Sequence, residues 1–311
     1  MDGLLIVDKP SGPTSHDVVA RVRRLLRERR VGHTGTLDPL ASGVLPLVLG
    51  RATRLARFLD GDKKYDAVIR LGVDTDTYDR LGEPVGIEST GPWPKRADVE
   101  AALAPFVGTF LQRPPAFSAK KIDGERSYEI ARRTRHQPDA ERPAPPASVA
   151  VTTSAIEVLD TVGPVVRLRV HCSAGFYVRS LAHDLGVALG IGGHLTELRR
   201  IEAAGVGVDD AVPLAELERE TPDAATRALL PIDSMLASVP SVQLTEVGVT
   251  YARAGRDIGP SDAVEGFTMA MLAVHETPAR HVRLMGPRGH LVAMAEAGKV
   301  PGLLHASVVL M

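Results

Sequence analysis

Two strand-like segments follow each other with only four residues between them, and this spacing limits how the chain can fold. TSAIEVLD (153–160) and VVRLRVHCS (165–173) alternate apolar and polar side chains, which is typical of half-buried strands. Parallel neighbours need a crossover of a dozen or more residues, so such a short link requires antiparallel pairing. Helical segments such as YVRSLAHDLGVALG (177–190) are interspersed with the strands. We therefore expect an α+β fold with a mixed, mostly antiparallel sheet flanked by helices.

Other segments carry signals for individual elements. DGLLIVDKPSG (2–12) predicts a strand that ends at a Pro-Ser-Gly turn, and KKYDAVIRLGV (63–73) and QLTEVGV (243–249) predict further strands. Ser15 or Thr14 can cap a helix from His16 to Arg30, where apolar residues recur at helical spacing. Helices are also expected over RATRLARFLDG (51–61) and from Asp98 to Val107.

The length of 311 residues fits one large domain followed by a small one. We place the boundary near Ser238 to Ser241, which gives a first domain over 1–240 and a second over 241–311. Alternating apolar patterns and glycine turns predict that the second domain is small and β-rich. RRTRHQPDAERPAPPAS (132–148) is polar and proline-rich and is predicted to be an exposed loop inside the first domain.

Composition excludes several classes of protein. No segment approaches the ~20 apolar residues of a membrane helix, so we expect no membrane partner. MDGLLIVDKP has no basic leader, so we expect a cytoplasmic protein. A monomer is the default expectation. The single cysteine, Cys172, rules out an internal disulfide, and no closely spaced His/Cys set predicts a metal. The net charge of -1 hides a basic run, RVRRLLRERR (21–30), and an acidic region from Ile201 to Pro240.

The glycine-punctuated segment GHTGTLDPLASG (32–43) carries one acid, Asp38, before a proline. A phosphate cradle is disfavoured because the Lys-Ser or Lys-Thr of a Walker loop is missing and an acid would repel phosphate. Asp-Pro is a common helix start, with the aspartate as the cap. A catalytic carboxylate on a hinged loop is the third interpretation. The loop alone does not decide between the last two.

This loop and five further segments of the chain resemble motifs of one protein family. GHTGTLDPLASGVLP resembles the catalytic motif of the TruB family, the synthases that make pseudouridine in the T-loop of tRNA. The other matching segments, in chain order, are DKPSGPTSHDVV (8–19), KKYDAVIRLGVDTDTYDRLG (63–82), PPAFSAKKIDGERSYEIAR (114–132), HCSAGFYVRSLAHDLG (171–186) and HLTELRR (194–200). The resemblance implies the pseudouridine synthase fold, a thumb loop over about 114–148 and a PUA-like domain after residue 241.

The resemblance also implies a reaction. The C1′–N1 bond of a uridine at position 55 breaks, the base turns, and the base rejoins the sugar through C5, with no cofactor. Asp38 matches the family's essential aspartate, Arg179 matches the arginine that pairs with it, and Tyr65 matches a tyrosine that stacks on the base and can move a proton at C5. Whether Asp38 attacks C1′ or the base, or assists uracil departure, stays open.

Further residues match positions that contact tRNA or support the site. These are His33, Thr34, Lys9, Leu198, Tyr177, Asp79, Lys120, Lys121 and Arg132. Among them His33 is placed against the RNA, Asp79 in a turn that positions neighbouring loops, and the basic thumb residues near phosphates. The motif is altered at the thumb, where a lysine, Lys120, precedes the motif lysine. The alternative function, a non-catalytic RNA-binding or tRNA-folding module, would have no use for the pair Asp38 and Arg179.

Overall fold

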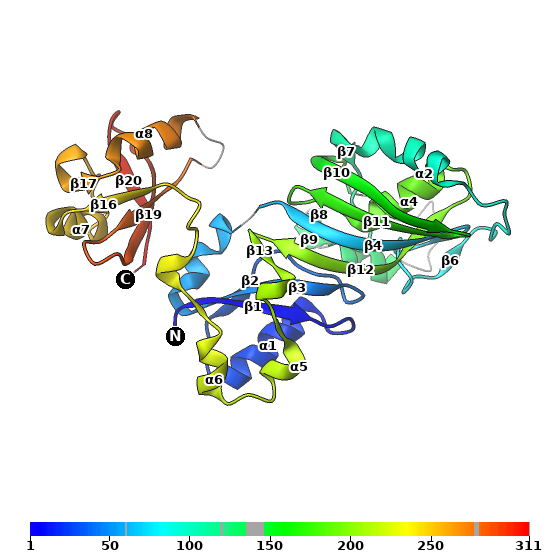
Figure 1. Ribbon diagram of the computed structural model, residues 1–311, viewed down its shortest axis with the longest axis horizontal. Helices are drawn as coiled ribbons and strands as arrows, with labels where there is room; N and C mark the ends of the chain where they lie inside the picture. The colour runs from blue at the N-terminus through cyan, green and yellow to red at the C-terminus, as the bar shows by residue number, and fades with distance from the viewer. Residues whose placement is uncertain (60, 119–120, 123, 135–145, 277–279, 311) are drawn as a thin grey trace.

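The computed structural model describes residues 1–59, 61–118, 121–122, 124–134, 146–276 and 280–310. Its largest unit is an 11-stranded sheet with the order β14-β1-β3-β12-β4-β11-β10-β7 (Figure 1). Three short strands lie off this path: β2 pairs with β3, β13 with β12 and β15 with β1. The strands of this sheet are β1 Gly3–Lys9, β2 Val31–His33, β3 Ser42–Leu49, β4 Lys63–Leu71, β7 Gly108–Gln112, β10 Val149–Val162, β11 Val165–Cys172, β12 Gly193–Ala203, β13 Val206–Gly207, β14 Val212–Pro213 and β15 Leu230–Pro231.

The pairing directions confirm the predicted mixed, mostly antiparallel sheet. Only β1 with β14 and β3 with β12 pair in parallel among the strands described in this sheet. The segments separated by four residues, β10 and β11, pair antiparallel as predicted, from Thr153 opposite Cys172 to Val162 opposite Val165. HLTELRR, for which no element was predicted, lies within β12 at the centre of the sheet.

Both faces of the sheet are covered at β1, which explains its unbroken apolar run. Leu5 and Val7 pack in one core with the helices α1 Ser15–Leu26, α2 Arg96–Leu103 and α4 Val178–Ala188. Leu4 and Ile6 face the other way, toward η1 Gly50–Phe58 and the C-terminal sheet. Since every side chain of this run is buried, the alternation of a half-exposed strand is absent.

Three predicted elements differ at their ends or in type. Thr14 caps α1 through a capping box with Asp17, but the helix ends at Leu26 because Arg27 adopts a left-handed conformation, so its predicted extension to Arg30 is wrong. The helix predicted over 51–61 is a 3-10 helix, η1. The predicted strand QLTEVGV is wrong in its second half, because the Thr245 hydroxyl accepts a hydrogen bond from the Gly248 N–H and starts α7 Glu246–Arg253.

The C-terminal domain is a second, smaller sheet with the order β17-β16-β18-β19-β20, and it lies to one side of the large sheet (Figure 1). Its elements are β16 Ser241–Leu244, β17 Ala263–Glu265, α8 Phe267–Glu276, β18 Val282–Met285, β19 Leu291–Ala297 and β20 Leu304–Val309, together with α7. The predicted small β-rich domain is confirmed, and its PUA-like character stays a prediction. Met294, Val308 and Leu310 pack against the η1 side of the large sheet in a shared apolar cluster.

The remaining elements are short. They are β5 Asp74–Thr75, β6 Pro84–Val85, η2 Ala104–Phe106, β8 Lys121–Ile122, β9 Glu125–Arg126, α3 Ser127–Thr134, η4 Val208–Asp210, α5 Leu214–Leu217, α6 Pro222–Arg227, η5 Ile232–Ser234 and η6 Pro260–Asp262. The loop predicted over 132–148 lies largely outside the described residues. No helix in the described part of the chain is long and apolar enough to cross a bilayer.

Candidate active site

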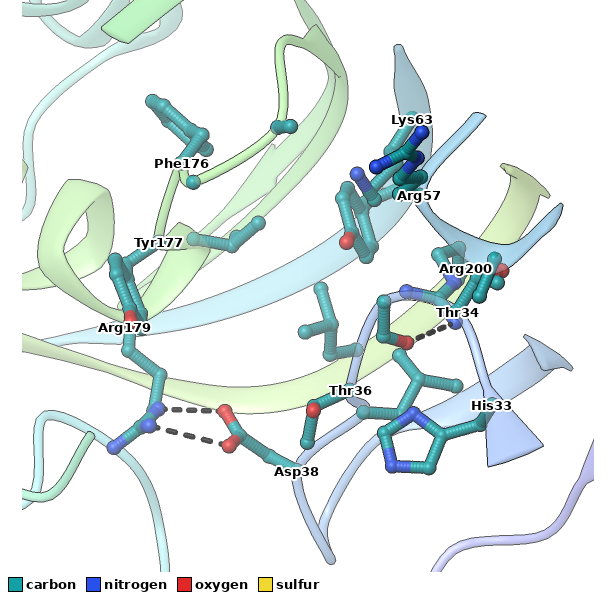
Figure 2. Close-up of a pocket in the computed structure, with 18 residues that line it drawn as sticks. His33, Thr34, Thr36, Asp38, Arg57, Lys63, Phe176, Tyr177, Arg179 and Arg200 are labelled. Atoms are coloured by element: carbon teal, nitrogen blue, oxygen red, sulfur yellow. Dashed lines mark hydrogen bonds and ion pairs between the residues drawn. The ribbon is translucent and has the colours of Figure 1, made fainter. Parts of the chain in front are cut away.

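A cavity of about 690 Å³ opens where the loop before β3 meets the start of β4, the end of β12 and the segment before α4. Asp38, Tyr65 and Arg179 all line it, and so do the predicted binding residues His33, Thr34, Tyr177 and Leu198 (Figure 2). The fold thus gathers residues that are far apart in the sequence into one depression.

Asp38 and Arg179 form a two-pronged ion pair. Arg179 Nε lies 2.8 Å from one carboxylate oxygen and Nη2 lies 3.2 Å from the other, as the dashed lines in Figure 2 show. The Arg179 side chain is only 5% exposed, whereas the Asp38 side chain is 33% exposed. A rigid buried guanidinium therefore holds a carboxylate that still faces the cavity.

Three more oxygen atoms surround the Arg179 guanidinium. Its Nη1 donates to the Thr77 carbonyl at 3.1 Å and its Nη2 donates to the Phe117 carbonyl at 2.9 Å. The Asp79 carboxylate lies 3.7 Å from Nη1 and itself accepts hydrogen bonds from the Thr77 hydroxyl and the Leu81 N–H. Asp79 is buried outside the lining of the cavity, so its contacts are with the arginine and its own turn.

The loop that carries Asp38 is fixed through hydrogen bonds to its backbone, the first of them from the side chain of Ser15 at the start of α1. The Ser15 hydroxyl accepts from the Leu37 N–H at 2.9 Å and donates to the Leu37 carbonyl at 3.1 Å. After Asp38 the chain makes a turn, in which the Ala41 N–H donates to the Asp38 carbonyl at 3.0 Å, and then enters β3. No helix follows Pro39, so the helix-cap interpretation of Asp38 does not hold.

Lys9 supports this loop from behind. It is fully buried, and its Nζ donates to the carbonyls of Pro10 at 3.0 Å and Pro13 at 2.8 Å. The Gly12 N–H between them donates to the Pro39 carbonyl, next to Asp38. Burial lowers the pKa of Lys9 to about 8.

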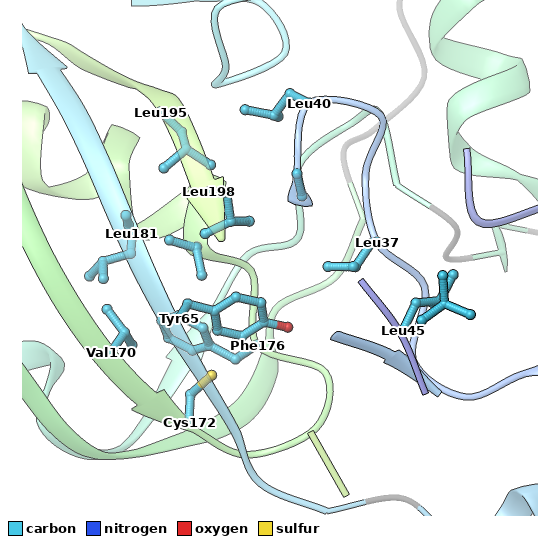
Figure 3. Packing of buried hydrophobic residues seen from close by; sticks show 14 of the residues in the cluster. Leu37, Leu40, Leu45, Tyr65, Val170, Cys172, Phe176, Leu181, Leu195 and Leu198 are labelled. Carbon is cyan, nitrogen blue, oxygen red and sulfur yellow. The ribbon is translucent and has the colours of Figure 1, made fainter. Parts of the chain in front are cut away.

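Tyr65 closes the inner end of the cavity. Its ring is 7% exposed and packs with Leu198, Phe176 and Cys172 (Figure 3). Burial raises the pKa of the Tyr65 hydroxyl. Since Tyr65 and Leu198 belong both to the apolar core and to the cavity lining, they offer a flat apolar surface on which a base could stack.

The other predicted binding residues occupy different surroundings. His33 lies edge-on to His16 with ring centroids 5.3 Å apart, burial lowers its pKa, and its Nδ1 has no hydrogen-bond partner among the described residues. The backbone of Tyr177 is held by Gln112 through two hydrogen bonds, and burial raises the pKa of its hydroxyl. Lys121 lies in β8 and Arg132 in α3, while Lys120 lies outside the described residues.

The cavity contains basic residues that were not predicted from the sequence. Arg57, Lys63 and Arg200 line it in addition to Arg179, and Asp38 is the one acid among the described residues that line it. Arg200 follows Leu198 by two positions, so the alternation of a strand over HLTELRR would have placed both on one face. Four cations beside one carboxylate suit a polyanionic ligand. Among the described residues, no group of three or more His, Cys, Asp or Glu could hold a metal ion.

Comparisons with known proteins agree with this architecture. The family described as TruB family pseudouridylate synthase (N terminal domain) matches residues 23–178, and the tRNA pseudouridylate synthase B C-terminal domain matches residues 179–237. A tRNA pseudouridine synthase B from Solibacter usitatus is 43% identical over 100% of both chains. One from Cupriavidus pinatubonensis is 41% identical over 89% of this chain and 88% of that protein.

Solved structures extend the likeness to three dimensions. A chain in a structure of an H/ACA RNP bound to a substrate RNA is 25% identical with a TM-score of 0.70, covering 99% of this chain and 85% of that chain. A chain in a Cbf5-Nop10-Gar1 complex is 27% identical with the same TM-score and coverage. The fold and the family matches define the chain as a pseudouridine synthase, an isomerase. It belongs to the TruB family.

Proposed function

We propose that the protein converts the uridine at position 55 in the T-loop of tRNA to pseudouridine, with Asp38 as the nucleophile and the target base swung out of the RNA into the cavity. The observation that carries this proposal is the two-pronged pair between Asp38 and Arg179 at 2.8 Å and 3.2 Å. The guanidinium orients the carboxylate through two hydrogen bonds, while the partial exposure of Asp38 leaves it free to attack.

The remaining residues of the cavity suit a flipped uridine. Tyr65 and Leu198 give the base an apolar surface for stacking, which is worth about 1–3 kcal/mol per base. The isomerisation breaks C1′–N1 and forms C1′–C5, and the proton at C5 leaves while N1 gains one. We propose that Tyr65, which lines the cavity, moves such a proton. The named relatives in bacteria are tRNA pseudouridine synthases, which supports tRNA as the substrate.

A T-arm stem-loop that carries tritium at C5 of its uridines tests the proposal, because formation of the C1′–C5 bond releases this label. We expect release with the native protein and at most about 10⁻³ of that rate with Asp38→Asn, since the nucleophile is lost while the size of the side chain is kept. Asp66→Asn is the matched control, because Asp66 also pairs with an arginine, Arg169, but in an exposed position.

The alternative function is a non-catalytic RNA-binding or tRNA-folding module, favoured by the four cations in the cavity. Stem-loop binding without any release of label would support this alternative and overturn the proposed catalysis. In either case Lys120, Lys121 and Arg132 are proposed to contact phosphates, so affinity should fall as salt rises.

A further inference from the structure

Arg200 is a fully buried arginine on β12, which lies in the sheet between β3, the strand after the Asp38 loop, and β4, the strand that carries Tyr65. In the strand register it lies opposite Tyr65 of β4 and opposite Gly43 of β3. Its side chain has no exposed surface, although it lines the cavity. Burying a cation here costs desolvation free energy. We therefore expect the Arg200 guanidinium to make compensating hydrogen bonds or to act in the reaction.

Two hydrogen bonds from Arg200 hold the loop on both sides of Asp38. Its Nη2 donates to the Gly35 carbonyl at 2.9 Å, before the aspartate, and its Nε donates to the Val44 carbonyl at 2.7 Å, after it. A Cβ on Gly43 would lie 2.1 Å from the Arg200 carbonyl, and Gly43 has a φ of +102°. The glycine therefore permits β3 to approach this closely.

The third nitrogen of the guanidinium, Nη1, is buried and makes no hydrogen bond to the described residues. It points to the side of Gly35, where an added Cβ would lie 3.2 Å away. A charged donor left unsatisfied in this way costs free energy at rest and is available to an oxygen that becomes negative during a reaction.

The Tyr65 hydroxyl belongs to the residue paired with Arg200 in the strand register, and both residues line the same cavity. Burial raises the pKa of this hydroxyl, and Asp38 and Cys172 act in the same direction, while the charge of Arg200 opposes them. Arg200 is thus the group that favours the phenolate among those that act on this hydroxyl.

We propose that Arg200 is a positioning residue that couples the two groups, fixing the loop of Asp38 and stabilising the ionised hydroxyl of Tyr65. This rests on the proposed function. In the balanced step, the Tyr65 hydroxyl gives its proton to N1 of the freed uracil, directly or through water. The phenolate, facing Arg200, then takes the proton from C5 after the C1′–C5 bond has formed. Tyr65 returns to the phenol, and the net change is one proton moved from C5 to N1.

Single-turnover rates with saturating T-arm RNA test the coupling. We expect Arg200→Gln to lose about 100-fold, as is typical for removal of one preorganised donor. Combined with Tyr65→Phe, Arg200→Gln should cost less than it does alone, because the contribution through the phenolate is already lost and only the contribution through the Asp38 loop remains. A double variant that shows the full product of the two single losses, or a loss of RNA affinity in place of rate, would overturn the proposal. Arg199→Gln is the matched control, because Arg199 pairs with Asp8 outside this cavity.

A titration of the phenolate separates this proposal from the proposed function. The ultraviolet absorbance difference between the native protein and Tyr65→Phe reports the ionisation of Tyr65 without any substrate. We expect Arg200→Gln to raise the pKa of Tyr65 and Arg200→Lys, which keeps the cation, to raise it less. The same pKa in all three folded proteins would refute the proposal. If no label is released by the native protein, the proposed function fails while this titration still tests Arg200.

Discussion

Replacement of Arg179 by lysine separates the charge of the pair from its geometry. Lysine keeps the positive charge but has one nitrogen in place of a planar fork. In the native protein the fork serves both Asp38 oxygens and the carbonyls of Thr77 and Phe117, which lie on different segments. A single ammonium cannot satisfy all four oxygens, so Asp38 loses its fixed orientation while it remains charged.

The size of the effect follows from these contacts. At least two hydrogen bonds to a charged group are lost, at about 1.5 kcal/mol each, or about 3 kcal/mol in total. If orientation of Asp38 is needed in the transition state, this corresponds to a rate loss of about 150-fold. The folded state suffers less, because water in the cavity can reach the partly exposed Asp38, so we expect Tm to fall by no more than about 5 °C.

The assay is release of tritium in single turnovers, together with a melting curve and an RNA affinity for each variant. Arg169→Lys is the matched control, because Arg169 makes a similar fork with Asp66, at 2.8 Å and 2.9 Å, on the exposed face of β11. We expect this control to be fully active. Native rates for Arg179→Lys with a native melting curve would refute the reasoning, and so would an activity loss that only mirrors unfolding.

Two predictions concern stability. Because Lys9 has a pKa of about 8 against 10.5 in the unfolded chain, the unfolded state binds more protons between these values. The unfolding free energy should therefore rise with pH across this window, by about 3 kcal/mol at most, relative to Lys9→Met in denaturant titrations. An equal pH dependence in both proteins would contradict this. Gly43→Ala should cost at least about 2 kcal/mol more than Gly12→Ala, because both glycines have positive φ but only Gly43 meets backbone, and equal losses would refute the clash.

The sequence predicted the elements whose signals are local. A helix cap at Ser15 or Thr14 could be predicted from one helical turn, and the structure selects Thr14. The link between β10 and β11 excludes a crossover by its length. The glycine loop and its motif pointed to Asp38, and the motif before α4 pointed to Arg179. These patterns are contained in a few neighbouring residues, so no knowledge of the fold is needed to read them.

Contacts between distant segments were decided by the tertiary structure. Asp38 and Arg179 are 141 residues apart, and their two-pronged geometry depends on how α4, which carries Arg179, and the loop before β3, which carries Asp38, are placed. Arg200 resembles any surface arginine in HLTELRR until the register sets it opposite Tyr65 with no exposed surface. Strand patterns determine which face a side chain takes, but the neighbour it meets depends on pairing order and register, and these follow from burial across the whole domain.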